Sequence, residues 1–416
     1  MISPSRRMMQ SWPAAGSDGI VEEANVTATI HAEQLYAEET LFARGTVAGE
    51  FAFVAQDGRR ADGMLHQLSA QDQARRTLEN LDVALKTAGL DLGKIINLMV
   101  YLPEYSDAWP VAELLDTALG KNSATYPATT LVGVSALEGG CRVRMDAIAT
   151  SNRDRESFRL SDLPLAPGSR CHGVRVGNLV FLSGVDAADA QGNIASAVTI
   201  QSQTQEVLTR INKILNHQKL SLGDLCRTFM FIPSTIYRPG YGEARKEKYK
   251  GIFAEDEFPP NSGIYIRDLG RNILLRSAAM AYRGTKSIVA SPKVRKAPGS
   301  FSQSIRVGDW LLLAGQDAVG FNREVEAEGD LAGQTEATLR HVKDILEEAG
   351  GTLDDVVKTT VYLIPGQDHS RFADAYRQFF NRQRRSSEMP AGLTVEVGEL
   401  SPRCLVEIDA VAFLGH

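Results

Sequence analysis

The chain has 416 residues and a formal net charge of −6. This acidic balance gives no chain-wide basis for binding a nucleic-acid backbone, which requires clustered Lys and Arg. No run reaches the roughly 18 apolar residues of a membrane helix, and the first residues lack the apolar core of a signal peptide. We therefore expect a cytoplasmic protein that binds neither nucleic acid nor membrane, with a flexible tail over residues 1–28.

A block of about 130 residues occurs three times in tandem, which sets the architecture before any other signal. Gly49, Gly177 and Gly308 begin equivalent apolar runs and lie 128 and 131 residues apart. An aromatic or Met residue followed by Pro repeats with the same period, at 126–127, 258–259 and 389–390. Blocks of this size fall in the usual range of single domains. We assign the domains to residues 29–150, 163–284 and 293–416.

Within each block the hydrophobic periodicity predicts two strands, a helix, a strand, a second helix and two closing strands. The first helix of each copy is marked by an apolar stripe at helical spacing: Leu78, Leu81, Leu85 and Ala88; Val207, Ile211, Ile214 and Leu215; Leu339, Val342, Ile345 and Leu346. The strands that follow are expected at 98–102, 229–232 and 360–364. The connectors 151–162 and 284–299 read as linkers, and the basic run in the second reads as solvated.

Cysteine and histidine usage gives no support for a metal or cofactor site. Cys141, Cys171, Cys226 and Cys404 show no CxxC spacing, which favours reduced thiols in a cytosolic protein. The histidines show no ligand spacing, and no Walker-type or Rossmann glycine pattern occurs. Cys171 and His172 are adjacent, so on a strand they point to opposite faces and do not predict a nucleophile with its base. We expect no cofactor.

The third copy carries the clearest family resemblance. Its segments 334–350, Val356-Val357-Lys358-Thr359-Thr360-Val361-Tyr362, Met389-Pro390-Ala391 and 406–412 resemble the Rid family, the YjgF-type imine and enamine deaminases. The resemblance extends to 73–102 and 126–149 in the first copy, and to 177–281 in the second. It implies an α+β fold of three tandem Rid-like (chorismate-mutase-like) domains that form a single-chain pseudo-trimer, alone or in a higher assembly, with sites in the clefts between domains.

The resemblance also implies where substrate and water would bind. In the family an arginine just after the Pro-Ala pair holds the substrate carboxylate, a task that suits the guanidinium fork. The matching positions here are Thr129, Asn261 and Gly392, and a nearby family cysteine is replaced by Leu131, Gly263 and Thr394. The family glutamate that orients or activates water is kept only as Glu407, whereas Arg144 and Arg276 occupy the equivalent positions.

These substitutions define the candidate site residues. Glu407 is predicted to be the general base, with an interface ion pair as the alternative. Arg276 and Arg170, beside the strand end Ser183-Gly184, are predicted to hold a carboxylate or phosphate, with solvent exposure or pairing to acids as the alternative. Sequence equivalence adds three further candidates for substrate binding: Arg144, Thr394 and Gly315.

The predicted function is hydrolysis or rearrangement of a carbon-nitrogen bond in a small anionic metabolite. An upstream enzyme that makes the reactive imine is the expected partner. Because a fold can host unrelated chemistries, a non-catalytic protein that binds or senses a metabolite in the same clefts remains the alternative. Endoribonuclease activity, a name sometimes attached to this family, is disfavoured by the acidic balance.

Overall fold

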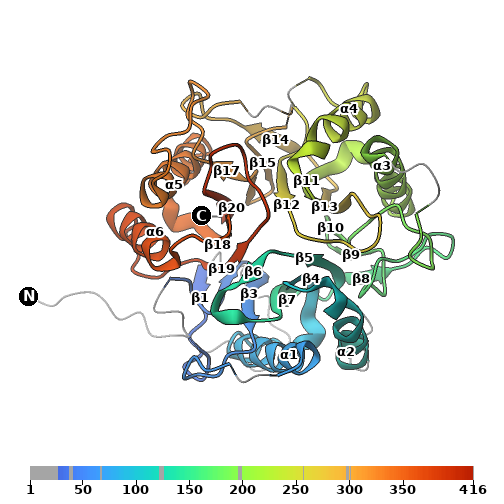
Figure 1. Cartoon of the computed structure of the whole chain (residues 1–416), viewed down its shortest axis with the longest axis horizontal. Coiled ribbons are helices and arrows are strands. Elements are labelled where there is room, and N and C mark those ends of the chain that lie inside the picture. The colour runs from blue at the N-terminus through green and yellow to red at the C-terminus, as the bar shows by residue number, and fades with distance from the viewer. Residues whose placement is uncertain are drawn as a thin grey trace, which may run out of the picture.

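The computed structural model describes residues 27–36, 41–65, 68–120, 126–194, 199–255, 257–296, 299 and 301–415. Three domains surround a common axis, with their sheets toward the centre and their helices on the outside (Figure 1). Each domain combines one mixed sheet with two helices, so the architecture is α+β, as predicted. Most of the proposed tail, residues 1–26, lies outside the described residues.

The predicted element order recurs in all three domains. Domain 1 contains β1 Thr27–Thr29, β2 Thr46–Ala48, β3 Phe51–Asp57, α1 Ala70–Thr87, β4 Ile95–Leu102, α2 Ala108–Gly120, β5 Ala128–Gly133, β6 Ala136–Leu137 and β7 Arg144–Thr150. Domain 2 contains β8 Arg155–Phe158, β9 Gly173–Val176, β10 Leu179–Leu182, α3 Ile200–His217, β11 Leu225–Ile232, α4 Arg238–Tyr249, β12 Asn261–Tyr265 and β13 Arg276–Tyr282. Domain 3 contains β14 Lys286–Val289, β15 Ser304–Val307, β16 Trp310–Leu313, β17 Gln316–Asp317, α5 Leu331–Glu348, β18 Val356–Leu363, α6 His369–Gln383, β19 Ala391–Glu396 and β20 Val406–Phe413.

The two connectors do not behave as the solvated linkers that the sequence suggested. Residues Arg155–Phe158 form β8, which pairs with β9, and Lys286–Val289 form β14, which pairs with β15. Burial of Phe158 anchors the first of these edge strands. The amine of Lys286 donates hydrogen bonds to the carbonyls of Gly223 and Leu225, so part of the basic run is engaged with the fold. The same pairing begins domain 1, where β1 lies along β2.

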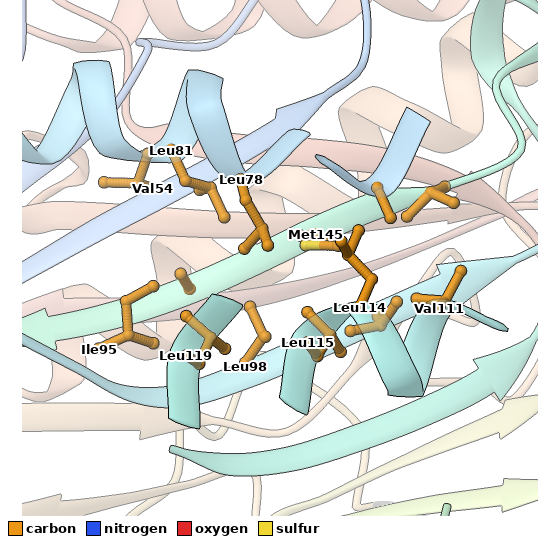
Figure 2. Packing of buried hydrophobic residues seen from close by; sticks show 14 of the residues in the cluster. Val54, Leu78, Leu81, Ile95, Leu98, Val111, Leu114, Leu115, Leu119 and Met145 are labelled. Atoms are coloured by element: carbon orange, nitrogen blue, oxygen red, sulfur yellow. The ribbon is translucent and has the colours of Figure 1, made fainter. Parts of the chain in front are cut away.

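Each sheet is covered on both faces, which explains its nearly continuous hydrophobic strands. In domain 1, Leu78 and Leu81 of α1 and Leu115 of α2 pack onto the sheet with Met145 of β7 and other buried residues (Figure 2). The opposite faces of the three sheets meet one another. There the ring of Trp310 lies 5.5 Å from Phe51, 5.6 Å from Phe53 and 4.7 Å from Phe413, measured between ring centroids.

The parallel strand pairs position the clefts. In each domain the long central strand is antiparallel to the closing strand and parallel to the strand after the Pro motif, as in β4 with β7 and β5. The free end of that parallel strand meets a loop of the next domain, through the bridges Gly133 to Asp268 and Tyr265 to Glu399. Between domains 3 and 1, β6 pairs with β19 and closes the ring. No helix in the described part of the chain is long and apolar enough to cross a membrane.

Candidate functional site

Three pseudo-equivalent clefts arise where the strand after the Pro motif faces the closing strand of the next domain. The first cleft lies between β5 and domain 2, the second between β12 and domain 3, and the third between β19 and domain 1. Arg276, Glu407 and Arg144 occupy the matching positions on the closing strands β13, β20 and β7. The chemistry of each cleft follows from what these three side chains contact.

The first cleft is closed by a buried ion pair. Arg276 is fully buried, and its Nε and Nη2 donate to Oδ2 of Asp186 at 3.0 and 2.7 Å. Its Nη1 crosses the domain interface and donates to the hydroxyl of Tyr105 at 2.6 Å and to the carbonyl of Leu131 at 2.7 Å. The guanidinium of Arg276 is therefore bonded to protein groups at all three nitrogens. These groups occupy the positions where the sequence predicted that a ligand anion would bind.

The other residues predicted for the first cleft also bind protein groups. The Oγ of Ser183 donates to the carbonyl of Cys171 at 2.7 Å and accepts from the amide of Thr129 at 3.2 Å. The amide of Gly184 donates to the carbonyl of Thr129 at 3.1 Å. Arg170 lies near the other end of β5, half-exposed, in an ion pair with Asp116. The structure therefore does not bring Arg170 and Arg276 together around one ligand, because each is held by its own acid.

The third cleft is closed in the same way, by a buried arginine that bonds to the neighbouring domain. We call Arg276 and Arg144 the locking arginines of the first and third clefts. Arg144 is buried, and its Nη1 donates to the carbonyl of Thr394 at 3.0 Å while its Nη2 lies 3.3 Å from Oδ2 of Asp57. Asp57 is directly opposite Arg144 in the β3–β7 register. The ring of Phe42 packs so closely over Gly392 that a β-carbon there would overlap it. Thr394 thus contributes its backbone to the lock, and the space that a ligand would need is occupied.

The second cleft is open, because the position of the locking arginine is held by Glu407. A cavity of about 120 Å³ lies between domains 2 and 3. Glu407 reaches this cavity from β20, and Gly315 lies against its carboxyl group, with any β-carbon only 2.9 Å from Cδ of Glu407. The lining side chains that carry charge or a hydroxyl include Arg238, Tyr241, Arg245, Tyr265, Arg295, Asp317, Ser401 and Glu407.

Burial and neighbouring acids favour the protonated form of Glu407. Its side chain is 7% exposed and makes no hydrogen bond with any group that the structure describes. Desolvation raises the pKa of Glu407 well above its usual range, and the carboxylates of Asp409 and Asp317 raise it further. Asp317 is directly opposite Glu407 in the β17–β20 register. A carboxyl group with a raised pKa inside a cavity is typical of a proton-transfer site.

Three arginines face this cavity from two domains. Arg295 is tied to Asp317 by two hydrogen bonds of 2.8 Å from its Nη2, so its charge is matched. Arg245 is buried among the rings of Tyr241, Phe258 and Phe301, and its Nε has no hydrogen-bond partner in the described chain. Arg238, at the start of α4, is half-buried and has no hydrogen bond or ion pair to any described residue. The cleft therefore presents cationic groups that are available to a ligand.

The residues that domain 2 contributes to the second cleft were not among the site residues predicted from the sequence. Arg238, Tyr241 and Arg245 recur at intervals of three and four along α4, so they lie on one helical face that an ordinary amphipathic helix would fill with apolar residues. That pattern was the available signal. Arg295 was not predicted either, because the basic run of the second connector was interpreted as solvated. Tyr265 ends β12, and its pKa is raised to about 12, first by burial, with Glu407 adding to the effect.

Other regions offer less chemistry. A wider depression of about 630 Å³ lies between the starts of α3 and α4, but its lining contains one carboxylate, Glu243, and no cationic side chain. Among the described residues, no three His, Cys, Asp or Glu side chains are grouped as a metal site requires.

Comparison with known proteins settles the family. A family model described as Endoribonuclease L-PSP matches residues 32–151, 162–282 and 293–414, most of the chain. A RutC family protein of Pyrococcus abyssi is 35% identical over 128 residues, which cover 31% of this chain and 97% of that protein. The chain belongs to the Rid family. The matched segment covers nearly all of that relative, so such a relative consists of one Rid domain, whereas this chain contains three.

Two further comparisons bear on chemistry and on fold. The 2-iminobutanoate/2-iminopropanoate deaminase of Escherichia coli is 32% identical over 124 residues, which cover 30% of this Rid chain and 94% of that enzyme. A crystal structure titled Chorismatase covers 88% of this chain and is itself covered completely, with a TM-score of 0.57 and 13% identity. At that identity the second likeness shows the shared fold alone.

Proposed function

We propose that this Rid protein hydrolyses the carbon-nitrogen bond of an imine or enamine in a small anionic metabolite, at the second cleft. The observation that carries the proposal is the exchange of the locking arginine for Glu407. In the first and third clefts Arg276 and Arg144 cross to the neighbouring strand and fill the space. In the second cleft a raised-pKa carboxyl group faces a cavity instead.

The cavity size and charge favour a small anion. Its volume of about 120 Å³ is below the roughly 300 to 1,000 Å³ of sites for drug-sized ligands. Asn261, at the position where the family resemblance implies an arginine, instead accepts a hydrogen bond from Thr228 through Oδ1 at 2.9 Å. Arg238 and Arg245 supply cationic donors from α4. We assign to them the carboxylate-binding role that the strand arginine has in the family.

Glu407 can serve both proton transfers of imine hydrolysis. In its protonated form it delivers a proton to the imine nitrogen, or to the β-carbon of an enamine, and becomes a carboxylate. Water then adds to the C=N carbon while the carboxylate takes one of its protons, which forms a carbinolamine. Returning that proton to the nitrogen breaks the C–N bond, and the carboxylate takes the hydroxyl proton as the C=O bond forms. This step releases ammonia and a neutral carbonyl compound and restores the protonated Glu407. A carboxyl group with a raised pKa suits this alternation.

The named relatives support this chemistry. The E. coli protein is named for deamination of two short 2-imino acids, and a protein of Dermatophagoides farinae with the same name is 26% identical over 129 residues. Imines of this kind arise transiently from amino-acid chemistry, so an upstream enzyme that generates them is the partner that the proposal requires.

The test is turnover by wild-type protein and by Glu407→Gln. Imines would be generated in situ from L-amino acids by an oxidase, and the rate of keto-acid release would be measured. We expect Glu407→Gln to lower turnover by about 10² to 10⁴-fold, the usual contribution of general acid-base catalysis. Glu336→Gln, which removes an exposed carboxylate of α5 paired with Arg382, is the matched control and should keep full activity. Equal turnover in both variants would contradict the proposed role, and ligand binding without any turnover would favour the metabolite-binding alternative.

A further inference from the structure

The second cleft carries more positive charge than one carboxylate can match. Among its arginines and carboxylates, Arg295 and Asp317 neutralise each other through their paired hydrogen bonds. Glu407 is held toward its neutral form by burial among other acids. The charge of Arg238 opposes the rise in the pKa of Glu407, but neither Arg238 nor Arg245 has a hydrogen bond or ion pair to an acid among the described residues.

Arg238 and Arg245 leave α4 at different points along its axis. Arg238 and Arg245 are seven residues apart on α4, so their backbones are displaced by about 10.5 Å along the helix axis, at 1.5 Å per residue. Arg245 is fixed between aromatic rings, with its Nη2 bonded to the carbonyl of Gly299. Arg238 stands free at the start of the helix. Two cationic side chains that leave the helix at different points favour a ligand with an anionic group at each end over one with a single compact anion.

The burial of Arg245 favours a second anionic group on the ligand. Arg245 is 4% exposed, and its Nε is buried without a hydrogen-bond acceptor. Leaving a buried charged donor unpaired is costly, whereas a carboxylate placed there would form a charge-assisted hydrogen bond.

We infer that the ligand of the second cleft is a dicarboxylate, a 2-imino or 2-keto acid whose side chain ends in a second carboxylate. One carboxylate binds Arg245 and the other binds Arg238, and the carbon next to the nitrogen lies toward Glu407. The inference rests on the proposed function for the nature of the reacting bond, but the affinity for a dicarboxylate can be measured without any turnover.

The experiment is calorimetric titration of the full chain with three stable probes. 2-Oxoglutarate represents the dicarboxylate, 2-oxobutanoate the monocarboxylate, and inorganic phosphate a compact dianion. We expect 2-oxoglutarate to bind at least about tenfold more tightly than 2-oxobutanoate, the effect of one further charged hydrogen-bonded pair. Arg238→Gln should remove most of that preference. Arg382→Gln, which removes an exposed arginine of α6 paired with Glu336, should leave it unchanged.

Each result decides the inference. Equal binding of the two keto acids would overturn it, and tighter binding of phosphate would replace the dicarboxylate by a phosphorylated ligand. Because Arg245 is buried, its variant is Arg245→Lys, which keeps the positive charge but loses the guanidinium fork. We expect this variant to bind 2-oxoglutarate more weakly than the wild-type protein does. Tight 2-oxoglutarate binding with no imine turnover would refute the proposed function alone. Turnover of a monocarboxylate imine without 2-oxoglutarate binding would refute this inference alone.

Discussion

Replacing Asp186 by Asn tests whether the arginine of the first cleft is a structural lock. Arg276 is 0% exposed, and among the described residues Asp186 is the one carboxylate bonded to it, at 3.0 and 2.7 Å. The substitution keeps an acceptor oxygen but leaves the guanidinium buried beside the neutral groups of Tyr105 and Leu131. Breaking a buried pair in this way costs about 3 to 5 kcal/mol. Because one acceptor remains, we expect a loss in the free energy of unfolding near the lower limit, about 3 kcal/mol.

The assay is urea unfolding of the full chain, compared with Asp116→Asn at the same interface. Asp116 pairs with Arg170, whose side chain is 56% exposed, so that variant should lose no more than about 1 kcal/mol. The double replacement Asp186→Leu with Arg276→Met removes both buried charges and should recover most of the stability lost by Asp186→Asn. Equal losses for Asp186→Asn and Asp116→Asn would refute the view that burial makes Arg276 a lock.

Three further predictions concern the second cleft and the thiols. Gly315→Ala places a β-carbon against the carboxyl of Glu407, and a displacement of about 1 Å should lower turnover by about 10²-fold in the imine assay. Gly120→Ala, at a position of α2 with open space and outside the cavity lining, should keep full turnover. The pKa of Glu407 is raised in the folded chain, so the folded state keeps a proton that the unfolded state releases above about pH 4.3. The free energy of unfolding should therefore fall as the pH rises from there through the folded pKa. Urea titrations at pH 5 and pH 8 should show this fall for the wild-type protein but not for Glu407→Gln. Burial raises the pKa of Cys171, Cys226 and Cys404 to about 12, so at pH 8 iodoacetamide should label these thiols only after unfolding, and rapid labelling of the native chain would contradict their burial.

The candidate site could be predicted only in part, for a physical reason. Glu407 and Gly315 were identified because they lie in the copy whose motifs are clearest, and the structure places both at one cavity. Arg170 and Arg276 were grouped because they belong to one domain, but each already has an acidic partner, Asp116 and Asp186. Sequence equivalence shows where a side chain stands in the fold. Whether that side chain is free or already paired depends on neighbours in another domain.

The sequence by itself determined the repeat, the α+β class and the helical stripes, because periodicity and domain size are local properties that each copy repeats. Only the tertiary structure decided which cleft is open. The second cleft joins a helix face of domain 2, with Arg238 and Arg245, to the closing strand of domain 3, with Glu407. These residues are separated by more than a complete domain in sequence, so no local pattern connects them. Their chemistry arises from the packing of one domain against the next, which also closes the other two clefts with buried arginines.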